Sequence, residues 1–184
     1  MDQAKPFSVA ARVLHWTMAV LILAMLFIGV GMVSSTGRYH ALVVVHRPLG
    51  ALILALAAIR LVYRLLNPPP PLPAAMPRVL KLAAELSHYA LYALMFAVPL
   101  VGWSMLSAGG YPVVLYGPLR LPPILPHDVA LYATLRHTHT ALAFLLFFTF
   151  LAHLGAALMH ALLFRDGVFE SMASLKKGRG RKAA

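Results

Sequence analysis

The chain has 184 residues, of which 61% are apolar, and its 16 basic and 5 acidic side chains give a net charge of +11. A soluble domain of this size has about a quarter charged residues and under half apolar residues, so the composition excludes a soluble globular enzyme, a disordered chain and a fibrous protein. Cysteine is absent, which excludes disulfides, thiolate metal sites and covalently attached c-type haem.

Four apolar stretches are each long enough to cross a bilayer as a helix, which takes about 20 residues. They are predicted at residues 13–33, 41–65, 82–107 and 129–164. Uninterrupted runs of this length lack the alternation that a membrane β-barrel requires, so helices are expected. We therefore predict an all-α membrane protein, with one four-transmembrane-helix bundle over residues 1–175 and a basic tail over residues 176–184.

The links between the predicted helices differ in character. Residues 34–40 form a short polar link, and residues 67–77 are so rich in proline that an extended, stiff segment is expected. Residues 107–128 form the longest link. Its apolar centre predicts a segment that lies on the membrane surface.

Basic residues predict the orientation in the membrane. With a cytoplasmic N-terminus, twelve of the sixteen lysines and arginines fall on the cytoplasmic side and four on the outer side. By the positive-inside rule, both termini of this multi-pass membrane protein are expected on the cytoplasmic side. The basic tail is expected to contact anionic lipid headgroups of the bilayer and no nucleic acid.

Four histidines fall at paired depths within the predicted spans. His139 and His153 are 14 residues apart, which corresponds to roughly 21 Å along a helix and about 40° around it. The two therefore share one face of the last helix. His46 lies at the depth of His139 and His15 at the depth of His153, so two stacked bis-histidine sites are predicted inside the bundle.

Haem is the group that two facing histidines suit best. A zinc site normally takes three or four protein ligands, whereas haem needs only two axial ones. Small residues along the helices leave room for a flat macrocycle. Candidate partners for the haem propionates are the arginines near the predicted membrane surfaces, namely Arg47, Arg60, Arg64 and Arg136.

The other histidines have several readings. His88 is an alternative to His15 as ligand, or a member of a quinone site or proton relay. His160 shares the face of His153 only about 10 Å further along, which favours contact with a propionate or a lipid headgroup. His40, His127 and His137 are expected to be solvated. Any single membrane histidine is also explained by a hydrogen bond between helices, and the glycines by helix packing.

Several stretches in this order resemble the bacterial cytochrome b-561 family, part of a wider group of di-haem b-type cytochromes that includes hydrogenase and formate dehydrogenase membrane subunits. The resemblance covers about residues 8–173. It implies two non-covalent b haems, with His46 and His139 as iron ligands of the outer haem and His15 and His153 as those of the inner one. The stretches that carry it are Val13-Leu14-His15-Trp16, Val45-His46 with Gly50, Ala58-Ile59-Arg60-Leu61 with Arg64, Pro68-Pro69-Pro70, His88-Tyr89, Val98-Pro99-Leu100-Val101-Gly102, and His139-Thr140 with His153 and His160.

This resemblance implies an oxidoreductase that moves electrons between a periplasmic donor and the quinone pool. The most specific activity it suggests is that of a superoxide oxidase, which passes electrons from superoxide to ubiquinone. One alternative is a non-catalytic haem-bearing anchor and electron conduit for a dehydrogenase or hydrogenase partner. Another is a transporter that uses its histidines as proton relays, which predicts a colourless protein.

Overall fold

The computed structural model describes residues 6–173; the predicted basic tail at residues 176–184 lies outside them. Four long helices dominate the chain. Between and after them lie short elements: a 3₁₀ turn after the first long helix, a two-stranded hairpin before the fourth, and two short helical segments at the end of the described residues. In order, the elements are α1 (Val9–Ser34), η1 (Thr36–Arg38), α2 (Tyr39–Leu66), α3 (Arg78–Ala108), β1 (Val113–Tyr116), β2 (Leu119–Leu121), α4 (Val129–Met159), η2 (His160–Phe164) and α5 (Val168–Ala173).

The prediction of a four-helix membrane bundle is confirmed. Each of the four long helical segments is long and apolar enough to cross a membrane. The helices extend beyond three of the predicted spans, because their polar ends continue the same backbone hydrogen bonding. Large apolar side chains such as Phe27, Val44 and Leu163 are at least 70% exposed on the outside of the bundle. A surface of this kind suits lipid rather than water.

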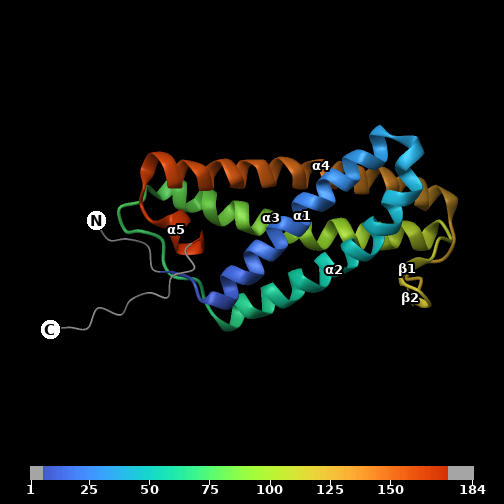
Figure 1. Cartoon of the computed structure of the whole chain (residues 1–184), viewed down its shortest axis with the longest axis horizontal. Coiled ribbons are helices and arrows are strands. Elements are labelled where there is room, and N and C mark those ends of the chain that lie inside the picture. Colours follow the sequence, from blue (N-terminus) through green and yellow to red (C-terminus); the bar gives the residue numbers. More distant parts are fainter. Residues whose placement is uncertain (1–5, 174–184) are drawn as a thin grey trace.

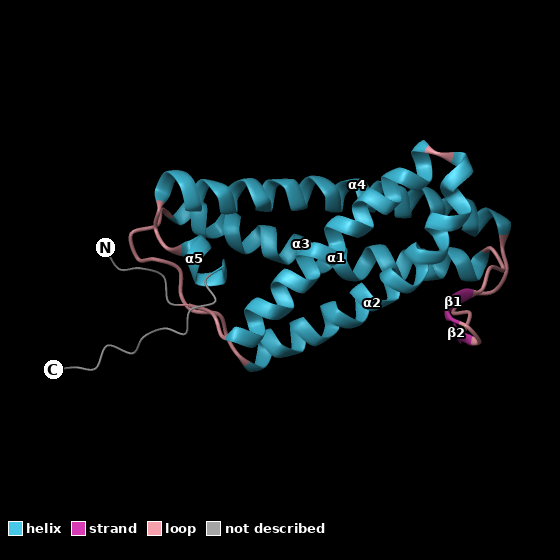
Figure 2. Ribbon diagram, in the orientation of Figure 1, coloured by secondary structure: helices cyan, strands magenta, loops and turns pink. Residues whose placement is uncertain are grey.

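The helices run between two ends of an elongated molecule (Figures 1 and 2). Helix α1 packs along α2, α3 packs along α4, and α2 also contacts α3. One end carries residues 34–40 and the β1–β2 hairpin, and we refer to it as the hairpin end. The other carries residues 67–77 and α5, and we refer to it as the α5 end.

A small apolar core holds the middle of the bundle together. It consists of Met18 and Ile22 from α1, Ile53 and Ala57 from α2, and Met95 from α3. Phe150 of α4 packs against this cluster. On α2 the cluster falls between His46 and Arg60, so apolar packing separates two levels of polar side chains.

The link at residues 107–128 contains secondary structure that the sequence did not predict, and its place on the membrane surface stays a prediction. It contains an antiparallel hairpin in which Val113 pairs with Leu121, and Gly117 makes the turn with a φ of 52° that favours glycine. The indole N–H of Trp103 donates to the carbonyl of Pro122 at 2.9 Å, and the backbone N–H of Ile124 donates to Ser107 Oγ at 3.1 Å. These bonds tie the link to the end of α3.

Core packing predicts a stability test at Ala57, whose side chain is 0% exposed. Ala57→Leu adds three carbon atoms where the helices touch, and overpacking of this kind costs about 1–3 kcal/mol. Thermal unfolding of the purified protein in detergent measures the loss. The neighbouring Ala58 is exposed, so Ala58→Leu is the matched control. Equal stability of the two variants would contradict the packing described.

Candidate functional site

Two histidines from different helices face each other towards the hairpin end. His46 of α2 and His139 of α4 have ring centres 6.2 Å apart, with an angle of 73° between the rings. The Nδ1–H of His139 donates to the carbonyl oxygen of Val98 on α3 at 3.1 Å. This bond leaves the lone pair on Nε2. The Nδ1 atom of His46 is buried and has no hydrogen-bond partner among the described residues.

A glycine on α3 makes room for this pair. A Cβ atom built on Gly102 would lie 3.1 Å from Cε1 and 3.2 Å from Nδ1 of His139, closer than most real contacts. Gly102 therefore lets the His139 ring approach the α3 backbone and reach the carbonyl of Val98. In the sequence, the only indication of this close approach is the glycine one helical turn after Val98.

Three histidines meet near the α5 end. His15 of α1 and His153 of α4 have ring centres 6.3 Å apart, and His88 of α3 lies 5.3 Å from His153. The Nδ1–H of His88 donates to the carbonyl oxygen of Ala84 at 2.7 Å. All three imidazoles are partly buried. The structure thus brings both predicted pairs together and places His88 beside the second.

An arginine of α2 reaches into this group. The Nη2 atom of Arg60 donates to Nδ1 of His15 at 2.9 Å. Two guanidinium groups lie close to the ring of Tyr92 on α3, because the Cζ atoms of Arg60 and Arg64 are each 5.8 Å from its centre. Both arginines therefore lie at the level of the histidines, where the sequence placed candidate propionate partners.

The spacing of the rings suits a metal bound between them. A metal–imidazole bond is about 2 Å long and the ring centre lies about 1 Å behind the nitrogen, so two rings that share one metal have centres about 6 Å apart. Both predicted pairs match this separation, and the shorter one between His88 and His153 does not. Within residues 6–173, no group of three or more His, Asp or Glu is arranged to hold a metal ion. Two axial ligands are what haem requires.

The remaining histidines lie away from the paired rings. His40, His127 and His137 are exposed. His160 begins η2, and its Nδ1–H donates to the Asp166 carboxylate at 2.7 Å. Its predicted contact with a propionate or headgroup stays a prediction, since the structure gives it a carboxylate partner that sequence spacing did not reveal.

Basic side chains gather at the hairpin end. Arg38, Arg120 and Arg136 are exposed there. Arg47, next to His46, is partly buried and its Nη1 atom donates to the carbonyl of Pro112 at 3.3 Å. Its Nε atom is buried without a partner among the described residues. Arg47 thus links the start of the hairpin to the level of the first histidine pair.

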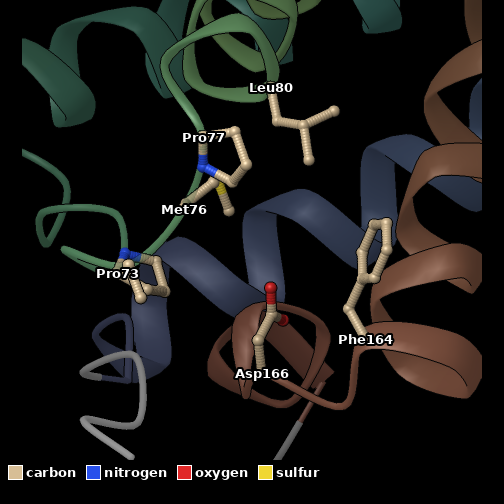
Figure 3. A pocket seen from close by; sticks show the side chains of 7 residues that line it. Pro73, Met76, Pro77, Leu80, Phe164 and Asp166 are labelled. Atoms are coloured by element: carbon tan, nitrogen blue, oxygen red, sulfur yellow. The ribbon is translucent and has the colours of Figure 1, made fainter.

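A separate cavity of about 320 Å³ opens at the α5 end (Figure 3). Apolar side chains from the proline-rich link and the start of α3 face Phe164 at the end of η2. The Asp166 carboxylate, held by His160, is its charged group. The labelled lining residues are Pro73, Met76, Pro77, Leu80, Phe164 and Asp166.

Two features escaped the sequence prediction. The carbonyl of Val98 orients His139, but a backbone acceptor has no sequence signature. Arg12 is 2% exposed, although the sequence had counted it only as an orientation charge. Its signal was its place three residues before His15, inside the apolar run of α1.

Four apolar helices that carry facing histidines at two levels define a membrane protein of the b-type cytochrome class. A family model described as prokaryotic cytochrome b561 matches residues 6–174. The chain belongs to the prokaryotic cytochrome b561 family, and the resemblance drawn from its motifs is thereby confirmed.

Two curated relatives are similar over most of the chain. Cytochrome b561 homolog 2 of Escherichia coli (strain K12) is 30% identical over 170 residues, which cover 90% of each protein. The probable superoxide oxidase CybB of Yersinia pestis is 30% identical over 135 residues, which cover 73% of this chain and 76% of the relative. Membership of the family makes the protein a multi-pass bacterial membrane protein of electron transfer and implies b-type haem.

With His139 as a haem ligand, the close approach at Gly102 predicts that haem affinity depends on the small size of this residue. Gly102→Leu is expected to push the His139 ring away from the Val98 carbonyl. Loss of a partner that orients a metal-binding histidine costs about 10- to 100-fold in affinity. Haem content per chain and the reduced absorption spectrum of the purified protein measure the effect. Gly29→Leu is the control, because nothing lies within 4 Å of a Cβ there; an unchanged haem content in Gly102→Leu would contradict the geometry.

Proposed function

We propose that the protein is a di-haem cytochrome b that passes electrons from a donor at the hairpin end to the quinone pool, with superoxide as donor and ubiquinone as acceptor. The observation that carries the proposal is the pair of ring separations, 6.2 Å and 6.3 Å, at two levels of one bundle. Bound there, the two haems would supply one-electron redox chemistry that the side chains of this chain lack. The ligands are His46 and His139 at one level and His15 and His153 at the other.

The protein side chains fix the orientation of the ligands. His139 donates its Nδ1–H to Val98, so its Nε2 lone pair is available to iron. His46 offers a buried imidazole whose Nδ1 has no other partner among the described residues. These two observations support the pair at the hairpin end as a complete axial set.

The pair near the α5 end requires one change of partner. While Arg60 donates to Nδ1 of His15, a neutral His15 keeps its proton on Nε2. Binding of iron through Nε2 therefore requires the guanidinium of Arg60 to leave this nitrogen. A propionate is the partner it would then take, because guanidinium and carboxylate groups form strong paired hydrogen bonds. Arg64, whose Cζ atom lies 5.8 Å from the centre of the Tyr92 ring, and Arg47, at the hairpin end, are further candidates.

The same proposal sets the protein across the bacterial inner membrane with both termini in the cytoplasm. The hairpin end would then face the periplasm, and its arginines would attract a small anion such as superoxide. At the α5 end, the cavity of Figure 3 has an apolar lining that a quinone ring could contact. Its volume of about 320 Å³ falls at the lower end of the range for small-molecule sites.

Purified protein tests this function directly. We expect about two haems per chain, reduction of the protein by enzymatically generated superoxide, and re-oxidation by ubiquinone without a partner subunit. Reduction and re-oxidation that require a partner would instead support an anchor for a dehydrogenase. A colourless preparation from haem-replete cells would contradict the haem sites altogether and favour a transporter.

The assignment of ligands predicts a pattern of losses. His46→Ala and His139→Ala are each expected to remove the same haem, and His15→Ala and His153→Ala the other, so that haem per chain falls by about half. His137→Ala is the control, because its ring is exposed beside His139 on the same helix. Optical redox titration identifies which haem remains. Retention of both haems in His15→Ala, with loss of one in His88→Ala, would reassign the ligand to His88.

Attraction of an anionic donor predicts a dependence on salt. Arg120→Glu is expected to slow reduction by superoxide severalfold at low ionic strength, with a smaller effect at 0.15 M salt because exposed charges are screened. Arg78→Glu, at an exposed position of the α5 end, is the matched control. Equal rates for the two variants at low salt would remove the steering argument.

A further inference from the structure

Arg12 is a buried cation that has no role in the haem sites proposed above. It is 2% exposed, and among residues 6–173 no other charged side chain is as deeply buried. Its Nε and Nη1 atoms are buried with no hydrogen-bond partner in that part of the chain. The guanidinium of arginine does not lose its proton in proteins. Burial of a charge costs free energy unless an opposite charge and hydrogen bonds compensate it, so we expect an anion to bind Arg12.

No carboxylate of the described polypeptide provides that anion. The ion pair recorded for residues 6–173 joins Asp166 to His160. Glu85 is exposed on α3, Glu170 is exposed on α5 without a recorded ion pair, and Asp128 caps the start of α4 at the opposite end. The anion that compensates Arg12 is therefore not a carboxylate of residues 6–173.

The position of Arg12 on α1 points towards the inner histidines. Arg12 precedes His15 by three residues, which places it about 4.5 Å away along the helix axis and about 60° around it. It precedes Trp16 by four residues, about 40° around the axis in the other direction. The side chain of Arg12 thus leaves α1 between the face that bears His15 and the face that bears Trp16.

Helix α5 closes this side of α1. The indole N–H of Trp16 donates to the carbonyl of Met172 at 3.1 Å, and the backbone N–H of Phe7 donates to the carbonyl of Ser171 at 3.0 Å. These bonds attach α5 to the chain before and after Arg12 in sequence. A lipid phosphate needs access from the headgroup region, which a side chain only 2% exposed does not offer. An anion that enters as part of a ligand inside the bundle fits this closure better.

We propose that Arg12 binds a carboxylate of the group held between His15 and His153, that is, a propionate of the b haem at this level. The inference rests on the proposed function, because it requires a haem at these two histidines. Arg12 suits the role because its donors are uncommitted and a guanidinium binds a carboxylate through two parallel hydrogen bonds. Arg60 becomes available for a propionate only after it leaves His15, whereas Arg12 needs no such change.

Redox titration of the purified holoprotein tests the proposal. In Arg12→Gln the propionate loses its counter-charge, and an uncompensated negative charge favours ferric over ferrous iron. We expect the midpoint potential of the haem that is lost in His153→Ala to fall, with that of the other haem unchanged. The carboxylate stretching band of the propionate in redox infrared difference spectra is expected to shift. Arg78→Gln, which removes an exposed charge at the same end, should change neither.

Three results would overturn the proposal. Both haems bound in Arg12→Gln, with unchanged potentials and an unchanged carboxylate band, would show that Arg12 does not touch the cofactor. Unchanged potentials together with less phospholipid phosphorus per purified chain would show that Arg12 binds the phosphate of a lipid headgroup instead. If Arg12→Gln does not fold, an unchanged carboxylate band in Arg12→Lys, which keeps the charge but lacks the paired donors, would also contradict it. Wild-type protein without haem would instead contradict the proposed function itself.

Discussion

The constraint on which the structure depends is the placing of imidazoles inside an apolar bundle. Each buried ring nitrogen needs a donor, an acceptor or a metal, because lipid and apolar side chains provide none. The bundle satisfies one side of His139 and His88 with backbone carbonyls of α3. The rings then face imidazoles from other helices at the same level. Helix packing and the two polar levels are thus parts of one arrangement, since the apolar core of Met18, Ile53 and their neighbours holds those levels apart.

The two ends of the bundle enclose these levels in different ways. At the hairpin end, Arg47 and Trp103 bond to carbonyls of Pro112 and Pro122 and hold the hairpin over the helix ends. At the α5 end, a short helix is held by Trp16 and by the His160–Asp166 pair. Both ends carry exposed arginines, and the α5 end also buries the cation of Arg12.

Length and hydropathy were enough to predict the four helices, and helical spacing was enough to predict which histidines share a level. Both depend on local geometry that repeats regularly along the chain. The hairpin at residues 113–121, the pairing of His160 with Asp166 and the burial of Arg12 were not predicted. Each of them depends on contacts at an end of the bundle, where the regular helical period does not apply. The strand pairing within residues 107–128 also depends on α2 and α3, which contact β1.

The group of three histidines near the α5 end shows how geometry can choose between ligands that the sequence leaves open. His88 has the tautomer that suits metal binding, because its Nδ1–H is used by Ala84. His15 has the better distance from His153, 6.3 Å against 5.3 Å. A tautomer changes when a side chain such as Arg60 moves, whereas the separation of two rings on packed helices changes only when the helices shift. Distance is therefore the stronger criterion, and it favours His15 as the ligand with His88 as a neighbour that borders the site.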